Sequence, residues 1–245
     1  MLSKRNKLAV AVAALCLLLG LVAAYRLLVD RGFEGKIVQV KYVVPLSIFP
    51  PEEAENSLEV AERLFEIPID TLKRMAEESG QRVRETTLTI RVKGDRYRVD
   101  TEQNGEMTSA IHAAVTSSDR SINQTEEDRF SMQATGDVAL MAGFRCQLYA
   151  GVNRRGDDIK LWLTTEVKNL SDSFANGFAI LLNAAPAGSA TAGERAFFAA
   201  TKGVPVLVHS ITPGELEIQQ TREIVGRPVP DDVFTGGTTV GAESR

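Results

Sequence analysis

Residues 87–110, TLTIRVKGDRYRVDTEQNGEMTSA, contain the pattern that decides the fold. Apolar side chains occupy every second position from 88 to 92 and again at 97 and 99, with Gly94-Asp95 between the two runs. A period of two is typical of strands that have one buried and one wetted face. Asn104-Gly105 follows, and this dipeptide is the strongest short hairpin signal that a sequence offers. The stretch therefore predicts three antiparallel strands joined by tight turns.

The chain on either side continues as short apolar runs separated by turn residues. Links such as Asn153 to Asp157 are too short for the crossovers that parallel strands need, so we expect antiparallel pairing. We predict an α+β fold, in which a strongly curved antiparallel half-barrel sheet has helices packed on one face. Further strands are predicted at 32–44, 129–134, 144–149, 159–167, 205–211 and 216–225, and short helices at 174–182 and 194–201.

Residues 51–80 predict a helical insertion after the first strand. From Glu52 onward the apolar residues recur at spacings of three and four, which indicates an amphipathic helix that starts behind Pro51. A second helix is expected to begin at Asp70 as its N-cap and to end before Gly80. Its buried residues are predicted to be Leu72, Met75 and Ala76.

The N-terminus carries an unbroken apolar run, Leu8 to Ala24, behind three basic residues at positions 4–7. Such a run enters a membrane as a helix during synthesis, and the positive-inside tendency keeps the basic residues in the cytoplasm. Two interpretations of residues 1–30 stay open: a signal peptide cleaved near Ala24, or a signal-anchor transmembrane helix over 8–29 that holds the protein in the inner membrane. Both predict that the remaining chain is exported to a periplasmic or other extracytoplasmic location.

No linker divides the rest of the chain, so residues 31–234 are predicted to form one domain and 235–245 a disordered tail. The chain has 28 basic and 32 acidic residues; without the three leader cations, 25 basic residues face 32 acidic ones, a net charge of −7. An acidic domain is a poor partner for nucleic acid, which binds to positively charged surfaces. Cys146 is the only cysteine outside the leader, so no internal disulfide can form, and a buried thiol is expected.

The residue types that carry catalysis or bind metals do not cluster in the sequence. His112 and His209 have no partners at metal-ligand spacing, and the sequence contains no nucleophile elbow, phosphate-binding loop or zinc-binding helix motif. We therefore predict a protein that is not an enzyme and that needs no metal or cofactor. An active site would require the fold to bring a histidine beside Cys146 or a buried carboxylate.

Four basic residues share one face of the central hairpin: Arg91, Lys93, Arg96 and Arg98. We favour cross-strand pairing with the nearby carboxylates of Glu85, Asp100 or Glu102 over a patch for lipid head groups or an acidic partner. The adjacent carboxylates Asp231 and Asp232 are expected to lie in a solvated turn.

A series of segments resembles, in order, an uncharacterised exported bacterial family that looks like a relative of the periplasmic lipoprotein-carrier fold of the LolA/LolB type. The segments are TIRVKGDRYRVD at 89–100, GFRCQLY at 143–149, IKLWLT at 159–164 and KGVPV at 202–206. The resemblance covers about residues 33–234. It implies an unclosed half-barrel whose concave side is lidded by helices over an apolar cavity. The helical insertion is longer than such a fold requires, and Phe234-Thr235-Gly236-Gly237 replaces the usual Pro-Gly-Tyr ending.

The resemblance implies a non-enzymatic cell-envelope protein that binds a lipid, an acyl chain or another hydrophobic ligand. The aromatic residues Trp162, Tyr149, Phe144, Tyr97 and Phe178 are the candidates for the cavity wall, and simple core packing is the alternative for each of them. The competing hypothesis is a membrane-anchored structural or interaction domain of an envelope complex. That domain would present the helical insertion or the polar loop Ser117 to Asp128 to a protein partner.

Overall fold

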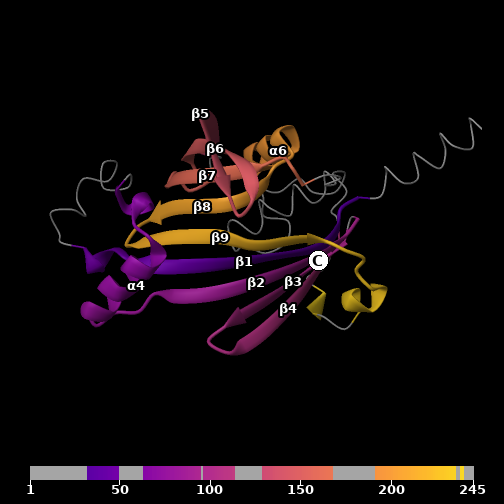
Figure 1. Ribbon diagram of the computed structural model, residues 1–245, viewed down its shortest axis with the longest axis horizontal. Helices are drawn as coiled ribbons and strands as arrows, with labels where there is room; N and C mark the ends of the chain where they lie inside the picture. The colour runs from indigo at the N-terminus through magenta and orange to yellow at the C-terminus, as the bar shows by residue number, and fades with distance from the viewer. Residues whose placement is uncertain are drawn as a thin grey trace, which may run out of the picture.

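The computed structural model describes residues 32–49, 63–94, 96–113, 129–167, 191–235 and 238–239. Their strands form one sheet in the spatial order β10-β4-β3-β2-β1-β9-β8-β7-β6-β5 (Figure 1). The strands are β1 (Glu34–Pro45), β2 (Arg84–Lys93), β3 (Arg96–Gln103), β4 (Glu106–Ala113), β5 (Ser131–Met141), β6 (Phe144–Val152), β7 (Asp158–Thr164), β8 (Val204–Thr212), β9 (Glu215–Gly226) and β10 (Thr238–Thr239). The α-helices are α4 (Ile69–Glu78) and α6 (Ala192–Thr201), and η1 (Leu46–Ile48) and η2 (Asp231–Phe234) are 3₁₀ turns.

Neighbouring strands run antiparallel, except that β10 runs parallel to β4. The turn between β3 and β4 places Asn104 at φ 53° and Gly105 at φ 83°, the left-handed pair that a type I′ hairpin requires. The three-stranded arrangement predicted from residues 87–110 is thereby confirmed. Because β5 lies at one end of the order and β10 with β4 at the other, the described strands form an open sheet.

The two faces of the sheet are distinguished at its central strand β1, because successive side chains of a strand point to opposite sides. Ile37 pairs with Ile90 of β2, and Ile90 pairs with Val99 of β3, so these three side chains share one face. Tyr42, five residues after Ile37, points to the other face together with its β9 partner Ile218. We name the two sides the α6 face and the α4 face, after the helices that cover them.

Each face has its own apolar core. On the α6 face, Phe198 of helix α6 is fully buried in a cluster that includes Ile37, Ile90, Leu161 and Val208. On the α4 face, Leu72 and Ala76 of helix α4 are fully buried against Tyr42, Val44, Leu216 and Ile218. The prediction that the helices pack on one face is therefore wrong. Both sides of β1 and β9 carry apolar residues, and a strand that is apolar on both sides needs cover on both.

Helix α4 confirms the second helix predicted in the insertion. The predicted N-cap Asp70 is wrong: the N-cap is Pro68, and Asp70 lies in the first turn, where a carboxylate interacts favourably with the helix dipole. The helix ends as predicted, because Gly80 takes a left-handed φ of 69° directly after the C-cap Ser79. Of the first predicted helix, only residues 63–66 belong to the described part of the chain, and these are helical.

Several predicted segments lie outside the described residues, namely the apolar leader 8–29, the polar loop 117–128 and the helix 174–182. Within the described ranges, no helix combines the length and the apolar character that crossing a membrane requires. In the segment predicted as a disordered tail, Thr238 and Thr239 pair with Ala110 and Ile111 of β4.

Candidate functional site

A cavity of about 310 Å³ opens on the α6 face, over strands β1, β9, β8 and β7. Polar and charged side chains supply most of its lining, and Ile159, Val208 and Phe130 supply the apolar part. The volume lies at the lower end of the range for ligand sites, so it suits a small molecule. The polar lining groups used below are Lys41, Arg155, Glu194, Ser210, Glu217 and Gln219.

The strand register sets the positions of the groups on the cavity floor. Lys41 lies on the same side of β1 as Ile37 and pairs with Gln219 of β9, while Ser210 of β8 pairs with Glu217 of β9. Paired residues point to the same side of a sheet, so all four side chains project from the α6 face. Lys41 Nζ lies 2.8 Å from Glu217 Oε2. An ion pair and two uncharged polar groups therefore sit together in the middle of the sheet.

A chain of hydrogen bonds continues from this floor into the protein. The Gln219 amide nitrogen donates to Gln39 Oε1 at 2.8 Å, and the Gln39 amide nitrogen donates to Thr221 Oγ1 at 3.0 Å. The Thr221 hydroxyl donates to the Pro205 carbonyl at 2.7 Å. Buried polar groups are costly unless they are paired, and these three side chains are buried and paired. The chain holds the Gln219 side chain in one orientation at the cavity floor.

Ser210 differs from these neighbours. Its side chain lines the cavity and is only 6% exposed, and its hydroxyl has no hydrogen-bond partner within the part of the chain that the structure describes. An unmade hydrogen bond at a buried hydroxyl costs about 1–3 kcal/mol. An unpaired buried group of this kind marks a place where a ligand or water can supply the missing partner.

Helix α6 brings a buried carboxylate to the cavity. Glu194 is 2% exposed, and its Oε2 accepts a hydrogen bond of 2.8 Å from the backbone N–H of Thr191. In return, the Thr191 hydroxyl oxygen accepts from the Glu194 backbone N–H at 3.2 Å, which completes a capping box. The sequence TAGE at 191–194 matches the capping-box pattern. This pattern indicates a helix that begins just after Thr191, whereas the sequence prediction began the helix at residue 194.

The aromatic residues predicted to line an apolar cavity lie elsewhere. Tyr97 is buried in the α6-face core, where burial raises its pKa to about 12. Tyr149 and Phe144 pack against the same core. Trp162 follows Leu161 in β7 and pairs with Leu207, so it points to the α4 face. Phe178 lies outside the described residues.

The fold therefore brings Tyr97, Tyr149 and Phe144 to one core and separates Trp162 from them. None of these four is among the described residues that line the cavity. Their role as the wall of a site for a hydrophobic ligand stays a prediction.

Strand β5 forms the second candidate site because it is an end strand of the sheet (Figure 1). It pairs with β6 on one side, and no strand among the described residues pairs with its other side. Val138 and Leu140 lie two positions apart on one side of β5 and are 51% and 77% exposed. The strand predicted from the sequence ends at Ala134, so the apolar second half of β5, residues 138–141, was not predicted.

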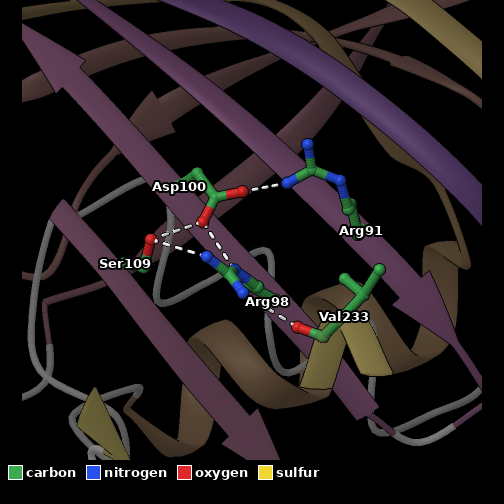
Figure 2. A network of polar contacts seen from close by, with 5 residues as sticks. All are labelled: Arg91, Arg98, Asp100, Ser109 and Val233. Atoms are coloured by element: carbon green, nitrogen blue, oxygen red, sulfur yellow. Dashed lines mark hydrogen bonds and ion pairs between the residues drawn. The ribbon is translucent and has the colours of Figure 1, made fainter. Parts of the chain in front are cut away.

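The four basic residues of the central hairpin lie on the α4 face, and two of them meet at a buried carboxylate (Figure 2). Asp100 forms ion pairs with Arg91 and with Arg98, whose Nε lies 2.6 Å from Asp100 Oδ1. The Ser109 hydroxyl donates to Asp100 at 2.6 Å and accepts from Arg98 at 2.9 Å. The favoured prediction, cross-strand pairing, is confirmed for Asp100. Glu85 instead pairs with Lys73 of helix α4.

The other two basic residues hold the C-terminal segment. Asp231 forms ion pairs with Arg96 at 2.5 Å and with Lys93 at 3.1 Å. Its hydrogen bond from Arg96, followed by that from Lys93, lowers the pKa of its carboxyl group. Arg98 also donates to the Val233 carbonyl at 2.9 Å (Figure 2). Asp231 lies in the exposed turn η2, as predicted from sequence, and its ion pairs also hold this turn against the hairpin.

The register keeps Cys146 and His209 apart. Cys146 of β6 pairs with Thr164, whereas His209 of β8 pairs with Lys160, four residues earlier in β7. Burial raises the pKa of the Cys146 thiol, which keeps it protonated and unreactive. The described fold does not form the His–Cys pair that would have indicated an enzyme.

No protein-family model matches the chain, and no curated protein is similar to it. Among solved structures, one similar chain comes from a crystal structure of MucB in complex with MucA(peri). The two chains are 10% identical and superpose with a TM-score of 0.36, over 82% of this chain and 54% of the other. This chain therefore matches about half the length of that one, and the similarity is distant.

Proposed function

We propose that this chain is a non-enzymatic interaction domain, working outside the cytoplasm, that binds an extended segment of a partner protein along the outer edge of β5. The extracytoplasmic location rests on the apolar leader of the sequence. The observation that carries the proposal is the combination of an end strand with two exposed apolar side chains, Val138 and Leu140. The N–H and C=O groups on the outer side of an end strand form a template for one more strand.

The composition of β5 supports this function. Proteins usually protect an end strand with lysines, prolines or short length. Over its 11 residues β5 contains no lysine, arginine or proline, and Asp137 is its one charged residue. A bulge near Gly136, which has a φ of 92°, interrupts the pairing with β6 and leaves 138–141 as a regular apolar half. A partner strand would gain backbone hydrogen bonds along this half and apolar contacts with alternate side chains.

Binding of a hydrophobic ligand, the function implied by the family resemblance, has less support. The described cavity is lined mostly by charged and polar groups, which an acyl chain cannot satisfy. The aromatic side chains predicted to form its wall pack into the core or point to the other face. A partner protein is therefore the better-supported ligand for this domain.

In-cell photo-crosslinking tests the proposal. A photoreactive residue at position 140 of the full-length chain should give one discrete protein adduct, because the side chain of Leu140 is mostly exposed. Val138→Lys should reduce this adduct at least about tenfold, since a charged side chain would have to be desolvated beside the partner strand. Both substitutions lie at exposed positions, so the fold should tolerate them.

Met107 provides the matched control. It is an apolar residue of 68% exposure on β4, near the opposite end of the sheet. A probe at 107 should give no adduct of the same mass. Equal adducts from 107 and 140, an adduct that survives Val138→Lys, or adducts to lipid alone would overturn the proposal.

A further inference from the structure

We propose that the polar cavity on the α6 face binds a small zwitterion of the amino-acid type, which carries one ammonium and one carboxylate group. The inference is independent of the protein-binding edge, because β5 contributes none of the described lining residues. It rests on the charges of the lining, on the unpaired hydroxyl of Ser210 and on the size of the cavity.

The charges around the cavity balance. Lys41 and Arg155 supply two positive groups, and Glu194 and Glu217 supply two negative groups. A ligand with a single charge would meet an opposing charge as well as a complementary one. A zwitterion can place its carboxylate near the cations and its ammonium near the carboxylates, so that each of its own charges meets an opposite charge of the lining.

The uncharged polar groups of the cavity also complement an ammonium group. Ser210 and Glu217 are cross-strand partners, so a hydroxyl and a carboxylate lie side by side at the floor. The Gln219 amide nitrogen is occupied by Gln39, and its carbonyl oxygen has no partner among the described residues. Ser210, Glu217 and Gln219 therefore offer three acceptors, the number of protons on a primary ammonium group. The Lys41 ammonium group carries three protons, and its contact with Glu217 uses one of them, so protons remain for the ligand carboxylate.

The position of these groups argues against a purely structural role. They occupy the middle of a sheet face whose flanks are apolar, where buried polar groups reduce stability unless every one is paired. The Gln39 and Thr221 side chains meet that requirement, whereas the Ser210 hydroxyl has no partner among the described residues. An unpaired buried hydroxyl that faces a cavity is accounted for when a ligand completes its hydrogen bonds.

Calorimetry on the full-length chain tests the inference with glycine, L-alanine, L-glutamine and glycine betaine as probes. Acetate, methylammonium and decanoate test the carboxylate, the ammonium and the apolar chain separately. At least one of the three amino acids should bind saturably at micromolar to millimolar concentration and raise the melting temperature. Glycine betaine should bind more weakly, because its quaternary nitrogen has no proton to donate to the three acceptors.

Two substitutions in the cavity locate the site. Ser210→Ala should weaken binding of the best amino acid about three- to tenfold, the loss expected for one hydrogen bond. Lys41→Gln should weaken it by tenfold or more, because it removes a charged donor. Lys36→Gln is the matched control: Lys36 forms a 2.5 Å ion pair with Glu223, also between β1 and β9, but on the α4 face.

The affinity should not change in Lys36→Gln. A cavity that holds only water would give no saturable signal with any amino acid and would overturn the inference. Binding of decanoate alone, or an equal loss in Lys36→Gln and Lys41→Gln, would overturn it as well. The crosslink at Leu140 tests the protein-binding function separately, so the failure of either proposal can be recognised.

Discussion

At the scale of single residues, His209 and Ser210 show how one strand places adjacent polar side chains on opposite faces of the sheet. They are neighbours in β8 and point to opposite faces. His209 is buried on the α4 face, where its ring stacks on Phe65 with a centroid distance of 5.0 Å. Ser210 faces the cavity with an unpaired hydroxyl. Neither the His209 ring nitrogens nor the Ser210 hydroxyl has a hydrogen-bond partner among the described residues, so each residue should limit the stability of the protein in a measurable way.

Ser210→Ala should stabilise the ligand-free protein. Removal of an unpaired buried hydroxyl relieves a cost of about 1–3 kcal/mol, so the free energy of unfolding in urea should rise by about 1 kcal/mol. Ser109→Ala is the control, because the Ser109 hydroxyl bonds to both Asp100 and Arg98. That variant should lose about 1 kcal/mol. A loss of similar size in both variants would mean that Ser210 has a partner in solution.

His209 should make the protein sensitive to mild acid. Burial, assisted by the nearby charge of Lys160, lowers its pKa from 6.5 to about 4. Between these values the unfolded chain binds a proton that the folded protein does not, so stability falls as the pH falls from 6.5 towards 4. A shift of this size corresponds to about 3 kcal/mol.

The His209→Leu variant isolates this effect. Urea unfolding across the same pH range should show that the free energy of unfolding changes less steeply with pH than in the unmodified protein. The difference should correspond to the uptake of about one proton. The carboxylates titrate in both proteins and cancel in the difference. Identical slopes would show that His209 is protonated inside the folded protein.

At the scale of elements, the pairing of β5 with β6 depends on a glycine, because a larger residue at that position would overlap the neighbouring strand. Gly151 of β6 pairs with Met132 of β5, and a Cβ atom at 151 would overlap the Ser131 carbonyl oxygen. Gly151→Ala should therefore push β5 away from β6 and reduce the free energy of unfolding by about 1–3 kcal/mol. Hydrogen exchange should become faster within Ser131–Met141.

Gly226→Ala is the matched control for this prediction. Gly226 lies at the end of β9, and the nearest atom to its added Cβ would be the Glu34 carbonyl oxygen at 3.9 Å, an ordinary contact. Its effect should stay within about 0.5 kcal/mol. Equal effects of the two substitutions would indicate that general glycine replacement, rather than overlap with β5, weakens the sheet.

Elements with strong local signals could be predicted from the sequence. The Asn104-Gly105 turn and the Gly80 helix end need left-handed backbone, and few residues other than glycine and asparagine adopt it readily. The second half of β5 could not be predicted in the same way. Gly136 and Asp137 interrupt its apolar pattern, and the bulge they form becomes visible only when β6 is in place.

The candidate sites depended on register, which the sequence does not reveal. Lys41 and Ser210 are 169 positions apart, and both come to one cavity only because β1, β9 and β8 are adjacent in the sheet. The aromatic residues did not indicate the polar cavity described here, because large apolar side chains are more often core than lining. Polar residues at inward positions of β1, such as Gln39 and Lys41, were the better clue.

At the scale of the whole molecule, the C-terminal segment after β9 links the neighbouring strands β1, β2 and β3. The Val229 N–H donates to Glu34 Oε1 at 2.7 Å, and Lys93 Nζ donates to the Val229 carbonyl at 3.0 Å. Beyond it, Asp231 reaches Arg96 of β3. The basic face of the hairpin is thus occupied by the chain itself, which makes it a poor surface for lipid head groups.

Asp231→Asn should release this segment. The Arg96 and Lys93 contacts lower the pKa of Asp231, so its contribution is present above the ordinary carboxyl pKa of 3.8 and is lost as the pH falls through the lower folded value. The ion pairs are solvent-exposed, so high salt should weaken them at neutral pH. Hydrogen exchange at Val229 and Val233 should become faster in the variant and, for the unmodified protein, in high salt.

Asp232→Asn is the control, because Asp232 forms no ion pair among the described residues, and it should leave both amides protected. Faster exchange in both variants would show that the backbone turn of η2, and not the charge of Asp231, holds the segment in place.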